Sequence, residues 1–293
     1  KFSIERSWSR ILYNRYKELK HIIIMIYILN NNRYFENLCE IISKTLNWPM
    51  TNVANDDNKT YLIFNAKDIS MPTKYIMYNF EQLDTTNTFE ESFWSKFHNA
   101  IKVFDYSHIN IAFLKAKNID ATFAPYGWNV LMKNKVIEPF NTRINNVMFL
   151  GYLNDRRINI LKPVHKLCKD KDYTMFLDNN CWSKEYDEMV KITKIGLNIH
   201  FYGGNTILEV HRIIPYILNK VYVVSERSQD PYYDNMMDGL VTWLNDLHEI
   251  DKIIEETLLI DPIIMERLLT NRQRLLIERC PMTATIELLE KID

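Results

Sequence analysis

The residues best suited to chemistry in this sequence are Glu209, His211 and Arg212, which follow the adjacent glycines Gly203 and Gly204. A carboxylate can accept two hydrogen bonds from a ribose diol, and a planar guanidinium binds a diphosphate through paired, charged hydrogen bonds. Glycines allow a ligand to approach the backbone closely. The whole chain has only 6 glycines, so an adjacent pair is informative. Together these residue types predict a site for a phosphate-bearing ligand.

The surrounding stretch, 195–227, predicts a strand, a turn, a helix and a second strand. Residues 195–201 form a near-continuous apolar run of strand length, and 221–224 form another. Between them, Asn205 and Thr206 are good helix-capping residues, and apolar residues up to position 218 mark one face of a helix. Such a βαβ unit requires a parallel sheet, whose ligands usually sit at the carboxyl ends of the strands. Amides at the helix start would then bind an anion.

Structural roles compete with these functional ones. Thr206-x-x-Glu209 is also a capping box, in which the glutamate returns to the cap amide. His211 is better explained as a packed or surface histidine than as a catalyst, and Pro215 predicts a kink inside the helix.

Size and composition indicate a globular protein of two domains. The chain has 293 residues, of which 47% are hydrophobic and 25% charged. A net charge of −1 gives no general attraction to nucleic acid or anionic membranes, and no basic stripe with interleaved aromatic residues is present. A nucleic-acid partner is therefore disfavoured.

The cysteines and the apolar runs bear on location. Cys39, Cys168, Cys181 and Cys280 are widely scattered, which predicts free thiols in a reducing compartment and no metal site. The longest apolar run, 22–29, is too short to span a bilayer, and no signal-peptide pattern opens the chain. These features predict a cytoplasmic protein, in the host cytoplasm if it is viral. The absence of an initiator Met is compatible with a segment of a longer protein.

The first 140 residues alternate predicted strands and helices, which favours a parallel α/β domain. The predicted strands are 21–29, 60–64, 75–78, 102–106 and 121–124, and the predicted helices are 1–20, 34–46, 89–97 and 108–116. The turn after the first strand lacks GxGxxG, so a dinucleotide site is not predicted there.

A second strand–loop–helix order follows a linker at 139–146. The predicted strand 147–150 leads into a loop with Gly151, Arg156 and Arg157, and then into a helix at 158–168. The arginines are either solvated or placed to contact phosphate beside a helix start. A strand at 173–177, a helix at 184–192, the βαβ stretch, a short strand near 238–243 and helices from 248 onward complete the chain. We therefore predict domains at 1–140 and 147–275, and a C-terminal helix at 276–293 that packs back on the first domain.

Residues 195–241 resemble the donor-binding segment of GT-B glycosyltransferases with the pattern E-x7-E. The corresponding parts here are FYGGN, TILEVHRIIPYILN, VYVVSE and DGLV. A longer run from 75 to 241, with YNFEQL, FLGYLNDRR and LNIHFY, is similar to uncharacterised glycosyltransferase-like proteins of giant viruses and microbes. The resemblance implies an α/β protein with two Rossmann-like domains facing a cleft, and with terminal helices. The first domain would bind the acceptor and the second the nucleotide sugar.

Carried onto this sequence, the resemblance makes Glu209 the glutamate that holds the nucleotide ribose. Arg212 and the loop from Gly203 to Thr206 would face the diphosphate, with Arg156 on the other side. The donor-binding candidates are Gly151, Arg156, Gly203, Gly204, Asn205, Thr206, Glu209, Arg212 and Glu226. The first glutamate of the pattern should lie near position 201, where this chain has Phe201 and Tyr202. Retention of stereochemistry therefore does not follow from the resemblance.

A catalytic base is expected from the first domain, at the carboxyl end of a strand across the cleft. Glu81, Asp105 and His108 qualify by position, and each has a structural alternative as a loop acid, a helix cap or a surface histidine. Glu81 is the first choice, because Tyr78 and Phe80 could desolvate it.

The resemblance implies a metal-independent transfer with no obligatory cofactor, a nucleotide diphosphate sugar as co-substrate and a glycan or other hydroxyl acceptor. The string Asp170-Lys171-Asp172 fits the metal motif of another glycosyltransferase fold, but it precedes a strand in a Lys-rich turn. Two alternatives remain open: a sugar-nucleotide epimerase or phosphorylase of the same fold, and a non-catalytic nucleotide- or glycan-binding module.

Overall fold

The computed structural model describes residues 25–30, 35–65, 70–83, 89–134, 136–181, 184–204 and 206–292. The helix predicted at 1–20 and the candidate residue Asn205 lie outside these ranges.

The first sheet has six strands in the order β2-β1-β3-β4-β5-β6, and all of its pairings are parallel. Its strands are β1 (Ile26–Leu29), β2 (Met50–Thr51), β3 (Thr60–Phe64), β4 (Tyr75–Asn79), β5 (Lys102–Asp105) and β6 (Ala121–Phe123). The helices between them are α2 (Glu36–Leu46), α3 (Glu91–His98) and α4 (His108–Ala116). Parallel strands need such crossover helices, so the predicted strand–helix alternation is confirmed. Only the two-residue β2 was not foreseen.

The second sheet has five strands in the order β11-β10-β9-β7-β8, again with parallel pairings. These strands are β7 (Asn145–Leu150), β8 (Met175–Asp178), β9 (Thr193–Asn198), β10 (Tyr222–Glu226) and β11 (Thr242–Leu244). The helices are α5 (Asp155–Asp170), α6 (Lys184–Ile192), α7 (Val210–Leu218), α8 (Pro231–Met237), α9 (Ile250–Leu258), α10 (Pro262–Arg279) and α11 (Thr283–Glu290). The βαβ unit predicted at 195–227 is therefore β9-α7-β10.

Two helix starts differ from the sequence-based expectation. The helix α5 begins at Asp155, because the side chain of Asn154 caps it by accepting a hydrogen bond from the Arg157 amide. Arg156 and Arg157 thus lie in its first turn and not in the preceding loop. The helix α7 begins only at Val210, with Glu209 as an N-cap residue that makes no side-chain capping bond. The carbonyl of Thr206 instead accepts from the Gln229 amide, which holds this segment beside the loop after β10.

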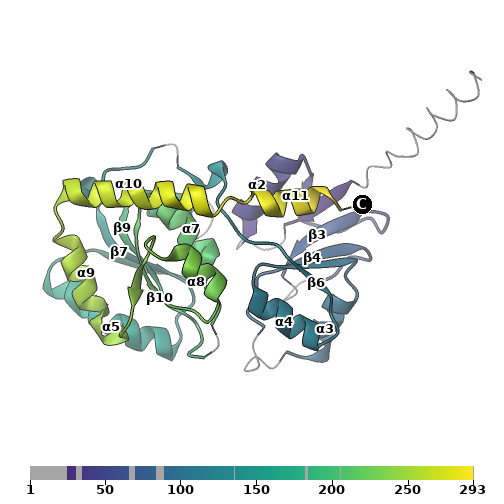
Figure 1. Ribbon diagram of the computed structural model, residues 1–293, viewed down its shortest axis with the longest axis horizontal. Helices are drawn as coiled ribbons and strands as arrows, with labels where there is room; N and C mark the ends of the chain where they lie inside the picture. Colours follow the sequence, from purple (N-terminus) through teal and green to yellow (C-terminus); the bar gives the residue numbers. More distant parts are fainter. Residues whose placement is uncertain are drawn as a thin grey trace, which may run out of the picture.

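Figure 1 shows the two sheets in two lobes that lie side by side. The helix α10 runs along the second lobe and leads into α11 against the first, where α11 packs on α2. At this crossing the Trp128 amide donates to the Cys280 carbonyl, and the Trp128 carbonyl accepts from the Met282 amide. Gly127 is required there, because a Cβ atom would lie 2.6 Å from the Pro281 backbone.

One hydrophobic core is shared by both lobes. Its buried side chains include Leu62 and Phe104 from the first sheet and Met148 and Val223 from the second. Tyr233 on α8 is fully buried and accepts a hydrogen bond at its hydroxyl from the Tyr126 amide of the first lobe, at 2.8 Å. The lobes are therefore joined by packed side chains as well as by the chain itself.

Candidate functional site

Charged side chains converge where β7, β9 and β10 of the second sheet end. They come from the first turn of α5, the loop after β9, the N-terminus of α7 and the end of β10. We call this group the Glu209 cluster; its members are Arg156, Arg157, His200, Glu209, Arg212 and Glu226. The carboxyl edge of a parallel sheet is where such folds bind ligands.

Glu209 is held by one of its two carboxylate oxygens. Oε2 accepts from Nδ2 of Asn198 at 3.1 Å and lies 2.8 Å from Nδ1 of His200. Oε1 lies 3.7 Å from the Arg157 guanidinium, beyond hydrogen-bond distance. The side chain is 17% exposed. Since the Glu209 side chain makes no capping hydrogen bond, the capping-box alternative is wrong. Oε1, which neither His200 nor Asn198 contacts, can accept from a ligand.

Burial by itself would raise the pKa of Glu209, but the neighbouring charges reverse that effect. His200, Arg212 and Arg157 together lower the pKa well below its usual range. Glu209 is therefore a carboxylate, and hence a hydrogen-bond acceptor only, at any pH near neutrality.

Arg156 and Glu226 form a bidentate ion pair at the carboxyl end of the second sheet. Both terminal nitrogens of Arg156 donate to the Glu226 carboxylate, and one also donates to the His200 carbonyl at 2.8 Å. Glu226 is 6% exposed and accepts in addition from the His200 amide at 2.6 Å. Both residues therefore brace the loop after β9. The Arg156 side chain remains 25% exposed, so it can also reach a ligand.

The guanidinium groups of Arg157 and Arg212 both lie close to Gly151. Arg157 is buried and donates to the carbonyls of Ile199 and Tyr152, and Arg212 donates to Oδ1 of Asn198 at 2.8 Å. Gly151 has φ +150°, and a Cβ there would lie 3.1 Å from Arg212 and 3.3 Å from Arg157. A side chain at this position would crowd both guanidinium groups, which explains why a glycine follows β7.

The glycine loop lies farther from the helix than expected. Gly203 and Gly204 are exposed and precede α7 by several residues, and Thr206 is buried. A Cβ on Gly203 would lie 3.4 Å from Nε of Arg156, so this loop borders the cluster although it does not form the first turn of α7.

The three candidate bases of the first lobe have different surroundings. Glu81 is half-buried and accepts from Nδ2 of Asn65 at 2.8 Å. Asp105 is fully buried and accepts from the side-chain amides of Asn79 and Asn110 and from the Ser107 amide. Burial raises the pKa of Asp105 to about 8, although these hydrogen bonds by themselves would lower it. Its contacts make it a brace between β4, β5 and α4.

His108 is exposed at the start of α4, where its ring stacks on Phe123 at 3.7 Å and meets the edge of Tyr232 at 5.4 Å. These contacts hold it beside α8 of the other lobe. Of the two candidate acids, Glu81 is partly exposed, whereas Asp105 is fully buried.

Tyr106 connects the two halves of the site. It is buried and stacks on Phe80 at 5.2 Å, beside Glu81 in the chain. Burial raises its pKa, and the carboxylates of Asp105, Glu209, Asp230 and Glu81 raise it further. Carboxylates of both lobes therefore act on the pKa of one buried tyrosine.

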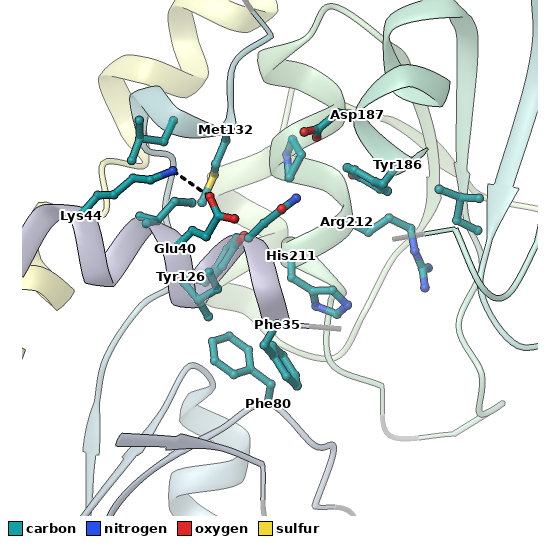
Figure 2. Close-up of a pocket in the computed structure, with 16 residues that line it drawn as sticks. Phe35, Glu40, Lys44, Phe80, Tyr126, Met132, Tyr186, Asp187, His211 and Arg212 are labelled. Atoms are coloured by element: carbon teal, nitrogen blue, oxygen red, sulfur yellow. Dashed lines mark hydrogen bonds and ion pairs between the residues drawn. The ribbon is translucent and has the colours of Figure 1, made fainter. Parts of the chain in front are cut away.

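A cavity of about 190 Å³ opens between α2 of the first lobe and α7 of the second. Figure 2 shows Phe35, Phe80 and Tyr126 on one wall and His211 and Arg212 on another. The Glu40–Lys44 ion pair and Asp187 lie at its rim. Because Arg212 also binds Asn198, the cavity adjoins the Glu209 cluster. It has the mixture of apolar walls and few polar groups that small-molecule sites show.

Within the described residues, no group of three His, Cys, Asp or Glu side chains is placed to hold a metal ion. Among the same residues, no helix is long and apolar enough to cross a membrane. All four cysteines are unpaired and buried.

The sequence patterns did not indicate Asn198 or His200 as site residues, and they indicated Arg157 only as a solvated or phosphate-contacting arginine. A signal was present, because Asn198 and His200 interrupt an apolar run that predicts a buried strand. Buried polar side chains need partners, and here both find Glu209.

Comparison with known proteins gives one sequence relative and many structural ones. No protein-family profile matches the chain. An uncharacterised protein of Acanthamoeba polyphaga mimivirus is 33% identical over 131 residues, which cover 44% of this chain and 42% of that protein. The chain thus spans less than half of the relative that it matches.

The structural similarity covers almost the whole chain. HepE of Anabaena, solved with UDP and glucose, has a TM-score of 0.59 at 11% identity, covering 90% of this chain and 98% of HepE. WaaG, a glycosyltransferase involved in lipopolysaccharide biosynthesis, has a TM-score of 0.54 at 10% identity with the same coverage. TarM has a TM-score of 0.54 at 10% identity, and the match covers 88% of this chain and 56% of TarM.

These neighbours have the GT-B glycosyltransferase fold, and the present chain shares it: two parallel α/β sheets face each other across an interface. The predicted fold class is therefore confirmed. At these identities the similarity establishes the fold and leaves the activity to be argued from the site.

Proposed function

We propose that this protein is a glycosyltransferase that uses a nucleotide diphosphate sugar as donor. The observation that carries the proposal is Glu209, a largely buried carboxylate with Oε2 held by His200 and Asn198, while Oε1 lies 3.7 Å from the Arg157 guanidinium, beyond hydrogen-bond distance. In the binding mode proposed here, Oε1 accepts hydrogen bonds from the nucleotide ribose diol.

The charge of the cluster suits the rest of the donor. Three arginines and, when protonated, His200 stand against the carboxylates of Glu209 and Glu226, which leaves a surplus of two positive charges. A diphosphate would neutralise this surplus, and Arg212 and Arg156 retain enough exposure to contact it. The loop with Gly203 and Gly204 would close the site near Arg156. HepE, whose structure contains UDP and glucose, has the same fold and is consistent with this donor class.

The acceptor would enter from the first lobe, through the cavity between α2 and α7. Glu81 is the proposed base: it removes the proton of the acceptor hydroxyl while that oxygen forms a bond to the anomeric carbon. The bond between this carbon and the diphosphate oxygen breaks, and the cluster stabilises the leaving nucleoside diphosphate. The proposed mechanism assigns charge stabilisation to arginine side chains and does not require a metal.

Thermal unfolding with added UDP, GDP, ADP and CMP tests the donor site, because a ligand that binds the folded state raises the midpoint. We expect one diphosphate to stabilise the wild type at a millimolar concentration. Glu209→Gln and Arg212→Ala should each weaken its affinity by about tenfold or more, the usual effect of losing a charged hydrogen bond.

Matched controls are Glu188→Gln, whose side chain is 73% exposed on α6, and Arg274→Ala, which is 58% exposed on α10. Neither substitution should change the rise in unfolding midpoint that the nucleotide causes. A wild type that unfolds cooperatively but responds to no nucleotide would rule out the donor site and favour a non-catalytic module. Donor breakdown that needs no acceptor and yields an isomerised sugar would favour an epimerase instead.

A further inference from the structure

His200 is a buried histidine whose two ring nitrogens both meet acceptors. Nδ1 lies 2.8 Å from Oε2 of Glu209, and Nε2 lies 3.0 Å from the carbonyl oxygen of Arg227. A neutral imidazole has one N–H group and one lone pair, so it can satisfy only one of these acceptors. The imidazolium can donate to both. With the side chain only 3% exposed, bulk water cannot take the place of either partner.

The charges around His200 come from four elements. Glu209 at the start of α7, Glu226 at the end of β10 and Asp234 on α8 are negative, while Arg156, Arg157, Arg212 and Arg227 are positive. Burial alone would lower the pKa of His200. Glu209, Glu226 and the Arg227 carbonyl more than offset it and raise the pKa above its usual value. The electrostatics thus agree with the hydrogen-bond geometry.

Through this contact His200 fixes the orientation of the Glu209 carboxylate. The His200 ring and the Asn198 side chain both contact Oε2, so that the carboxylate cannot rotate freely. The backbone of His200 is fixed in turn, because its amide donates to Glu226 and its carbonyl accepts from Arg156. Loss of the ring would free Glu209 to turn toward Arg157, which lies 3.7 Å from Oε1.

We propose that His200 is a positioning residue for ligand binding: as an imidazolium it clamps Glu209 with Oε1 toward the ligand and adds one positive charge to the site. This inference rests on the proposed function and deepens it. When His200 loses its proton, the surplus charge of the cluster falls from two to one. Affinity for an anionic donor should therefore decrease as the pH rises through the His200 pKa.

The test measures affinity by calorimetry between pH 6 and pH 9 for UDP-glucose, ADP-glucose and GDP-mannose. A diphosphate bound at both ends has no second ionisation near neutrality, so changes with pH report on the protein. The variants are His200→Asn, whose Nδ2 can still donate to Glu209 without a charge, and His200→Ala. His98→Asn, an exposed histidine at the end of α3, is the matched control.

We expect the wild type and His98→Asn to bind one donor more weakly as the pH rises. His200→Asn should bind with little pH dependence and about three- to tenfold more weakly than the wild type at pH 6, and His200→Ala about 10- to 100-fold more weakly. Equal affinity and equal pH dependence of the wild type and His200→Asn would overturn the inference while leaving the donor site in place. Failure of the wild type to bind any of the three sugars would instead overturn the proposed function.

The contact between His200 and Glu209 can also be tested without ligand, from the titration of the His200 ring. In NMR titrations, the histidine signal that disappears in His200→Asn should titrate above the usual pKa of about 6.5. In Glu209→Gln its pKa should fall, since the largest favourable charge is gone. An unchanged titration in Glu209→Gln would show that the pair does not form in solution and would overturn the inference.

Discussion

Buried acids of this protein are stabilised in different protonation states, and their neighbours decide which. Glu209 is surrounded by cations, which lower its pKa despite burial. Asp187 lines the cavity between the lobes and has no such partner. Burial, together with the charges of Glu188 and Glu40, raises its pKa to about 6. A carboxyl group is therefore a permanent hydrogen-bond acceptor at Glu209 and a titratable group at Asp187.

Asp187 should therefore make stability depend on pH. Its pKa rises from 3.8 in the unfolded chain to about 6 in the folded one, so the folded state binds more protons between those values. The contribution of Asp187 to stability is greatest below about pH 4 and is lost as the pH rises to about 6. We expect Asp187→Asn to be more stable than the wild type at pH 7, by about 1 kcal/mol after allowance for solvent screening.

Urea denaturation at pH 4, 5, 6 and 7 measures the gap, which is the difference in unfolding free energy between Asp187→Asn and the wild type at each pH. The gap should close toward pH 4, and comparing the two proteins cancels the other titrating groups. A gap that stays constant over this range would contradict the assigned pKa.

At the scale of elements, the packing of α7 on β9 fixes where the Glu209 cluster lies. Gly196 in β9 faces the buried ring of Tyr216 on α7, and a Cβ at this position would lie 2.7 Å from that ring. Pro215 lies inside the same helix and cannot donate a backbone hydrogen bond. The close approach of helix to strand therefore depends on a glycine.

Gly196→Ala should destabilise the protein by about 1–3 kcal/mol, because the ring can shift only by disturbing a packed core. Gly204→Ala is the control, since a Cβ there would have nothing within 4 Å. Chemical denaturation of both variants measures the difference. If Gly196→Ala is as stable as Gly204→Ala, the helix has room to move away and the packing argument is wrong. A partial recovery in Gly196→Ala with Tyr216→Leu would identify the ring as the cause.

At the scale of the whole molecule, the C-terminal helices join the two lobes. After α10 the chain crosses to the first lobe, where Met282 and Leu289 are buried and Thr285 donates to the Pro125 carbonyl at 2.6 Å. Ile286 is also buried, and α11 packs on α2, which lines the cavity. The domain boundaries predicted from sequence remain a proposal, but the shared core makes independent unfolding of the lobes unfavourable.

Truncation after Arg279 should severely destabilise the protein. Each of the three apolar side chains Met282, Ile286 and Leu289 contributes about 1.5–3 kcal/mol when buried, a sum comparable to the whole stability of a typical domain. We expect a protein that aggregates or melts at least 10 °C lower, observed by calorimetry. Lys291→Ala, at the exposed position after α11, is the control and should have little effect. A truncated protein with an unchanged melting temperature would mean that α11 adds nothing to the fold.

The sequence by itself determined the two parallel α/β sheets and the β9-α7-β10 unit in which we propose the donor site. Apolar runs and turn residues are local signals, and period and length are enough to read them. The N-cap of α5 was also a local signal, although it was not recognised: Asn154 precedes Asp155 as a capping residue should.

Only the tertiary structure decided what Glu209 does. Its capping alternative failed because Asn198 and His200, 11 and 9 positions away, take its carboxylate in three dimensions. In the same way Asp105, a positional candidate for the base, proved to be enclosed by three N–H donors from neighbouring elements. The partners of a buried polar group lie on other elements, and no local pattern along the chain specifies which of them it meets.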